Sequence, residues 1–169
     1  MNKGFTLIEL VVVIAVTAVL SGIILFTVTQ YIGKGKDSNI SGNLAILIPA
    51  GEVFYNGNGS SYNDGLASFC NPQQNSVLKN IISQMPDNPR GCSGGTRGGQ
   101  NAWTATSNPA GVCCITAIDG GAWAACASKF TNCPGVSCTA FCVDSMGRKK
   151  EIPVASCTAS TLASQCPEL

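Results

Sequence analysis

The sequence predicts an α+β protein in which one long N-terminal helix packs on a small antiparallel sheet that is reinforced by disulfides. Two observations favour this fold: an almost uncharged apolar block lies near the N-terminus, and all ten cysteines lie after residue 69 among short strand-like segments. The 169 residues suffice for one ordinary domain and an appended element. Charged residues make up 11 % of the chain and its net charge is +1, so composition indicates no nucleic-acid partner.

The apolar block from Phe5 to Ile32 contains one charged residue, Glu9. A helix of about 20 apolar residues crosses a bilayer, so we expect this block to be a membrane-spanning helix. It is longer than the apolar core of a secretory signal, and no small-residue cleavage site follows it. A carboxylate inside such a span costs about 2.5–3.5 kcal/mol and tends to be functional. Alternatively, Glu9 lies at the membrane interface, where the helix dipole favours an acid.

The opening residues Lys3-Gly4-Phe5-Thr6-Leu7-Ile8-Glu9-Leu10 resemble the processing motif of type IV prepilins and pseudopilins. The resemblance implies that residues 1–4 are a leader, that a membrane peptidase cleaves between Gly4 and Phe5, and that the same enzyme methylates the new amine of Phe5. It also implies that Glu9 neutralises the terminal amine of a neighbouring subunit and so fixes axial register in a filament. Small Gly4 would let a protease approach the backbone closely.

Residues 33–55 are expected to continue this helix beyond the membrane. Ile40, Leu44, Leu47 and Ile48 recur at helical spacing and would pack on the head, by which we mean residues 56–169. Because glycines and Pro49 weaken this stretch, we expect a linker-like break near residues 33–35. The resemblance offers an alternative, in which the helix unwinds there as the subunit enters a filament. Lys34 and Lys36 oppose the positive-inside tendency, so the orientation with the head outside follows the motif.

The cysteine-rich, extracellular head is expected to contain one short helix, Ser76 to Gln84, followed by a sheet. The strand-like segments are residues 102–106, 112–118, 122–130, 140–143 and 148–154, and the last two form a hairpin through the turn Asp144 to Gly147. Residues 56–62 and 141–149 resemble, more loosely, the turn after the long helix and the final hairpin of small pilin heads. Trp103 and Trp123 are expected in the sheet core.

An even number of cysteines in a chain without histidine favours disulfides in an oxidising compartment over a zinc site. If adjacent Cys113 and Cys114 lie in a strand, they point to opposite faces and reach different partners. A bond between Cys157 and Cys166 would resemble the C-terminal disulfide loop of many pilins. Each bond would add about 2–4 kcal/mol to a head with few large apolar residues. The disulfide candidates are Cys70, Cys92, Cys113, Cys114, Cys126, Cys133, Cys138, Cys142, Cys157 and Cys166.

Catalytic chemistry is not expected. Without histidine there is no Ser/His or Cys/His catalytic unit, and no phosphate-binding loop is present. Asp64, Asp119 and Asp144 lack the spacing of a calcium site, so neither a metal nor a cofactor is expected. No Cys-x-x-Cys motif occurs, which disfavours a thiol redox protein.

The resemblance implies a structural subunit of a type IV pilus, first a single-pass protein of the inner membrane and then part of an extracellular filament. Its implied partners are the prepilin peptidase and methyltransferase, identical or related pilin subunits, the inner-membrane assembly platform and membrane lipid. A pseudopilin of a type II secretion or DNA-uptake system is an alternative within the same superfamily. A membrane-tethered extracellular adhesin, or other binding module, is an alternative of another class.

Overall fold

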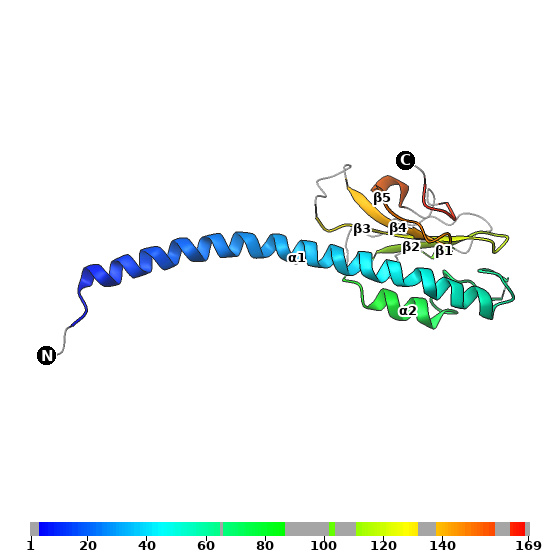
Figure 1. Cartoon of the computed structure of the whole chain (residues 1–169), viewed down its shortest axis with the longest axis horizontal. Helices are drawn as coiled ribbons and strands as arrows, with labels where there is room; N and C mark the ends of the chain where they lie inside the picture. The colour runs from blue at the N-terminus through cyan, green and yellow to red at the C-terminus, as the bar shows by residue number, and fades with distance from the viewer. Residues whose placement is uncertain are drawn as a thin grey trace.

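A computed structural model describes residues 4–64, 66–86, 102–103, 111–131, 138–157 and 163–167. Its dominant element is helix α1, Leu7–Gly57, whose N-terminal half stands clear of the head while its C-terminal half lies along the sheet (Figure 1). The expected break near residues 33–35 is wrong, because α1 is continuous there. The small size of Gly33 serves packing instead, since a Cβ at this position would lie 2.9 Å from Thr131 Cγ2. The exposed Pro49 also lies inside the helix.

Five strands form an antiparallel sheet in the order β1-β2-β3-β4-β5, so each strand pairs with its neighbours in sequence. The predicted strands are present: the second, third and fifth are shorter than expected, the fourth extends one residue further at each end, and residues 104–106 of the first lie outside the described residues. The second ends early because Gly120, with φ of 67°, turns the chain between β2 and β3. The strands are β1, Ala102–Trp103; β2, Val112–Thr116; β3, Trp123–Ser128; β4, Thr139–Asp144; and β5, Lys149–Pro153.

One face of the sheet packs against the helices in what we call the helix-side core. Ile40, Leu44 and Leu47 of α1 are fully buried there, as the helical spacing predicted. The short helix α2, Ser76–Ser83, adds Leu78, Ile81 and Ile82, and it begins where the side chain of Asn75 accepts hydrogen bonds from Val77 N and Leu78 N. Alternate residues of the central strands complete this core, namely Val112, Cys114, Trp123, Ala125, Ala127 and Val143.

Trp123 of β3 packs against α1, and its side chain is fully buried as predicted. Its ring lies 4.6 Å from that of Phe69, measured between centroids, and 6.4 Å from that of Tyr62. Gly51 of α1 faces the indole so closely that a Cβ there would lie 2.6 Å from Trp123 Nε1. A glycine at this point of the helix therefore lets the largest side chain of the core fit beneath it.

The opposite face of the sheet is buried as well, in what we call the outer core. Its members are Cys113, Ile115, Ala124, Cys126, Ala140, Cys142, Ile152, Cys157 and Cys166. Cys113, Cys126 and Cys142 stand next to one another across three strands. The described C-terminal residues, 154–157 and 163–167, which we call the C-terminal segment, contribute Cys157 and Cys166 to this face and begin with the 3-10 turn η3, Val154–Ser156. Half-cystines and small residues thus take the place that large apolar side chains occupy in most cores.

Three disulfides join the described cysteines to one another: Cys70–Cys114, Cys126–Cys157 and Cys142–Cys166. The suggested Cys157–Cys166 pair is therefore wrong, because each of these residues reaches back to a strand and ties the C-terminal segment to the sheet. Cys113 and Cys138 are disulfide-bonded too. Cys113 and Cys114 belong to opposite faces of β2 and to different bonds, as predicted. Cys92 and Cys133 lie outside the described residues.

Candidate processing and assembly site

The N-terminus of α1 is held by a reciprocal cap between Thr6 and Glu9. Glu9 N donates to Thr6 Oγ1 at 3.4 Å, while Glu9 Oε2 accepts from Thr6 N at 2.8 Å and from Thr6 Oγ1 at 2.7 Å. The arrangement satisfies backbone donors that a helix start leaves unpaired, and it places a negative charge at the positive end of the helix dipole. The carboxylate of Glu9 is thus directed toward the chain that precedes the helix.

Gly4 and Phe5 precede this cap in non-helical backbone. No atom lies within 4 Å of the position that a Cβ at Gly4 would take, and Phe5 is 83 % exposed. Phe5 and Glu9 line one shallow groove of about 370 Å³, together with Ile8, Val12 and Val13. Phe5 and Glu9 are four residues apart in the sequence, and only Glu9 lies within α1. The structure therefore brings the predicted site residues of the N-terminus together at one exposed end of the molecule.

Within the described part of the chain, the apolar half of α1 is not covered by other residues. Its most apolar window of 18 residues has a mean hydropathy of 2.8, and none of that window is buried. The side chains described between residues 7 and 32 are all exposed. By length and composition the helix can cross a membrane. A surface of this size and apolarity needs lipid or other helices to cover it.

The sequence analysis missed the residue that fastens α1 to the head. Asp37 is buried, and its carboxylate accepts hydrogen bonds from Phe130 N at 2.6 Å, Thr131 N at 3.2 Å and Thr131 Oγ1. This carboxylate thereby satisfies two backbone groups just beyond the end of β3. The sequence did contain a signal for this role, because Asp37 lies in the same helical stripe as Ile40 and Leu44, where a buried charge without a partner would be costly.

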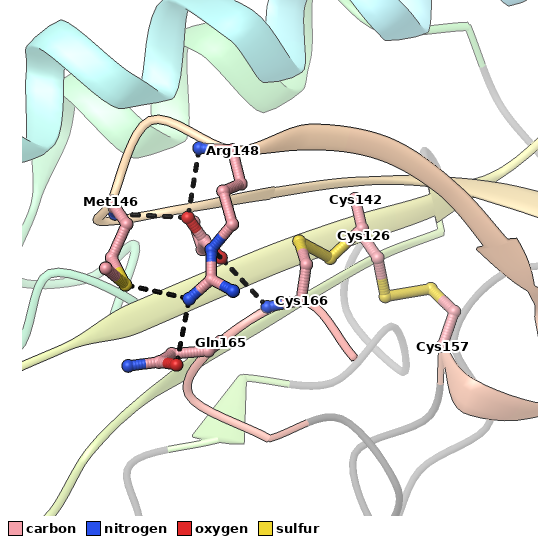
Figure 2. The surroundings of a disulfide bond; sticks show 8 residues. Cys126, Cys142, Met146, Arg148, Cys157, Gln165 and Cys166 are labelled. Atoms are coloured by element: carbon pink, nitrogen blue, oxygen red, sulfur yellow. Dashed lines mark hydrogen bonds and ion pairs between the residues drawn. A yellow bond between two sulfur atoms is a disulfide. The ribbon is translucent and has the colours of Figure 1, made fainter. Parts of the chain in front are cut away.

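A second buried carboxylate, Asp144, organises the end of the chain. Asp144 Oδ1 accepts from Met146 N and Arg148 N, each at 3.1 Å, which fixes the predicted β4–β5 turn. Asp144 Oδ2 accepts from Cys166 N at 3.0 Å and lies 3.0 Å from Arg148 Nε. Figure 2 shows Arg148 between this turn and Gln165, beside the two disulfides that hold Cys157 and Cys166. An Asp that opens a turn ending in Gly147 was the sequence signal for this arrangement.

Asp64 and Asp119, the other two acidic residues considered as calcium ligands, each accept hydrogen bonds from backbone groups of their own turn. Asp64 Oδ1 accepts from Leu66 N at 2.9 Å and from Ala67 N at 2.6 Å. The hydrogen bond from Ala67, followed by that from Leu66, holds the pKa of Asp64 below its usual range. Asp119 Oδ1 accepts from Gly121 N at 3.0 Å. Across the described ranges, the one group of three or more metal-ligand side chains that converges is Cys113, Cys126 and Cys157. All three are in disulfides and therefore offer no thiolate to a metal.

Comparison with known proteins gave a match at the N-terminus. Residues 1–25 match the family model described as the prokaryotic N-terminal methylation motif. The matched range contains Gly4, Phe5 and Glu9 and ends within the apolar half of α1. Searches of curated proteins and of solved structures returned no match.

Proposed function

We propose that this chain, which carries the N-terminal methylation signature of type IV prepilins and pseudopilins, is the precursor of a structural subunit of a type IV pilus. The observation that carries the proposal is the match of residues 1–25 to that signature, at the end of a long apolar helix that projects from a disulfide-linked head (Figure 1). Function in this proposal is assembly: the projecting helices form the filament core and the heads form its surface.

Processing begins at the junction of Gly4 and Phe5. Both residues are exposed and lie before the first helical turn, so a peptidase can bind the backbone on either side of the bond without unwinding α1. The leader, residues 1–4, is released on the cytoplasmic side, and the new amine of Phe5 is methylated. A prepilin peptidase and methyltransferase is therefore the first partner of the chain.

Assembly then depends on Glu9. Its contacts with Thr6 use Oε2, and we assign Oε1 to the amine of a neighbouring Phe5. In an apolar filament core an unpaired charge is costly, so the pair forms at one axial offset and selects one register. The same carboxylate in this way caps its own helix and receives the neighbouring subunit.

The chain has a different environment in each of its parts. Residues 5–32 span the inner membrane before assembly, and the head lies outside, where disulfides persist. The continuous C-terminal half of α1 links the two rigidly, because Asp37 ties it to the end of β3. Other subunits, the inner-membrane assembly platform and membrane lipid are the remaining partners.

A pseudopilin of a type II secretion or DNA-uptake system is the second candidate, because the matched signature serves pseudopilins as well. Electron microscopy of filaments sheared from cells, with mass identification of their subunits, separates the two. Abundant long filaments built mainly of this chain are the expected result. Filaments in which the chain is absent or a trace component would contradict the pilus role.

A further inference from the structure

The place where α1 leaves the head contains a groove that the filament role does not use. Its lining residues, which define the junction groove, are Ile32, Gly35, Lys36, Asn39, Gln84, Met85 and Pro86. The volume is about 360 Å³. One wall belongs to α1, and the other belongs to residues 84–86, which directly follow α2. Helix α2 runs back toward the side from which the apolar half projects (Figure 1).

The position of the junction groove relative to the membrane follows from where the apolar block ends. The block ends at Ile32, and Lys36 is four residues further, about 6 Å along the helix. The headgroup layer on each side of a bilayer is about 5–7 Å thick, given a core of roughly 30 Å within a total of 40–45 Å. The block of residues 5–32, about 42 Å long as a helix, exceeds the core and can tilt within it, so we place the outer boundary of the core at Ile32, where the block ends. With that placement the groove lies beside the phospholipid headgroups.

The chemistry of the groove fits that depth. Ile32, Met85 and Pro86 supply apolar surface, while Asn39 and Gln84 supply amide groups that can donate hydrogen bonds. Lys36 brings a positive charge, and its Nζ lies 4.7 Å from the ring centroid of Phe130, a contact that keeps its N–H donors near the head. Exposed Lys34 adds a second charge at the same depth, and exposed Tyr31 is an aromatic residue of the kind enriched at membrane interfaces.

We propose that the junction groove binds the headgroup of an anionic phospholipid in the outer leaflet of the membrane. Lys36 meets the phosphate, the amides of Asn39 and Gln84 face the glycerol esters, and the apolar wall receives the first carbons of an acyl chain. The inference rests on the proposed membrane insertion of residues 5–32. It also gives Lys34 and Lys36, which oppose the positive-inside tendency, a role outside the membrane.

Native mass spectrometry of the full chain in detergent, titrated with phosphatidylglycerol or phosphatidylcholine, tests the site. We expect one phosphatidylglycerol to bind about fivefold more tightly than phosphatidylcholine, the factor that one lysine near an anionic surface contributes. Lys36→Gln should remove this preference. Lys149→Gln, which changes an exposed lysine at the opposite end of the sheet, should keep it.

A second pair of variants leaves every charge in place. Gly35 lines the groove and Gly42 does not, yet neither position has an atom within 4 Å of an added Cβ, so both accept a side chain. Gly35→Leu should fill the groove and weaken lipid binding several-fold, whereas Gly42→Leu should leave it unchanged. Equal affinities for the two lipids, or equal behaviour of the two leucine variants, would overturn the lipid site.

Membrane insertion is checked separately by alkaline carbonate extraction of membranes that contain the chain. Release of the chain by carbonate would overturn both the lipid site and the membrane proposal on which it rests. Retention of the chain together with equal lipid affinities would contradict the lipid site and leave the pilus proposal standing.

Discussion

Single residues explain why α1 is continuous and packs on the head although its sequence contains several glycines. Gly33 and Gly51 lie on the face of α1 that meets the head, where Thr131 and Trp123 approach too closely for a side chain. Asp37, between them, binds the backbone beyond β3. These three residues therefore act through contacts with distant parts of the chain, which the helix propensities of glycine and aspartate do not reveal.

Gly51→Ala tests the close approach to Trp123. The added methyl group would lie 2.6 Å from the indole nitrogen of a fully buried ring, so we expect the free energy of unfolding to fall by about 1–3 kcal/mol. Gly42→Ala is the matched control, because its Cβ meets open space; it should be neutral or stabilise by up to about 1 kcal/mol. Denaturant unfolding of the full chain in detergent measures both. Equal effects of the two substitutions would disprove the packing role.

Ionisation of Tyr62 makes the free energy of unfolding depend on pH in the alkaline range. Burial, followed by the hydrogen bond of Tyr62 Oη to Glu52 Oε1 at 3.0 Å, raises the pKa of Tyr62 from 10.0 to about 12. The neutral phenol is thus favoured in the folded state, so its contribution to stability is complete below pH 10 and is lost as the pH rises from 10 to 12. We expect a loss on the order of 1–2 kcal/mol over this window, after allowance for solvent screening.

The measurement compares the free energy of unfolding of wild type and Tyr62→Phe between pH 8 and pH 12. The variant should lose less stability than the wild type over this range, because it lacks the ionising phenol. Tyr31→Phe, which changes an exposed tyrosine, should follow the wild type. A wild-type curve parallel to that of Tyr62→Phe would refute the linkage.

At the scale of elements, the disulfides decide which surfaces of the sheet are covered. Cys126 and Cys142 are adjacent in register and bind Cys157 and Cys166, so the C-terminal segment lies over the outer core. Removing Cys142–Cys166 by the double change to alanine should lower the free energy of unfolding by about 2–4 kcal/mol. It should also make residues 163–167 more accessible to proteases.

The matched comparison is the variant in which Cys70 and Cys114 are both changed to alanine, because the Cys70–Cys114 disulfide lies in the helix-side core. Its loss should destabilise the chain by a similar amount without selective proteolysis of residues 163–167. If the C-terminal segment is cleaved equally in both variants, the covering role of Cys142–Cys166 is wrong.

The elements show which parts of the structure could be predicted from sequence. Local patterns predicted the apolar helix, α2, the strand segments with the final hairpin, and the opposite directions of Cys113 and Cys114, since each depends on helical or strand periodicity or on a local turn. The pairing of Cys157 and Cys166 could not be predicted, because it depends on how the C-terminal segment folds back over the sheet. The continuity of α1 was missed for a similar reason: packing against Thr131 and the bonds of Asp37 outweigh the local cost of the glycines.

At the scale of the whole molecule, a disulfide-linked head is joined to an exposed apolar helix whose N-terminal end carries the Thr6 and Glu9 cap. In the proposed filament the charge of Glu9 sets the register of subunits. Glu9→Ala should leave membrane insertion intact and abolish filaments, as seen by electron microscopy and membrane fractionation. Glu9→Gln separates the two roles, since glutamine also supports a capping box but is neutral. Normal filaments from Glu9→Gln would contradict the charge-pairing account.

Intact-mass spectrometry of the subunit recovered from cells tests the central claim most directly, because the proposed processing and assembly both depend on cleavage between Gly4 and Phe5. The account predicts a mature chain that begins at Phe5 and carries one additional methyl group on its terminal amine. A chain that retains residues 1–4 in assembled filaments, or that begins at any later residue, would contradict it.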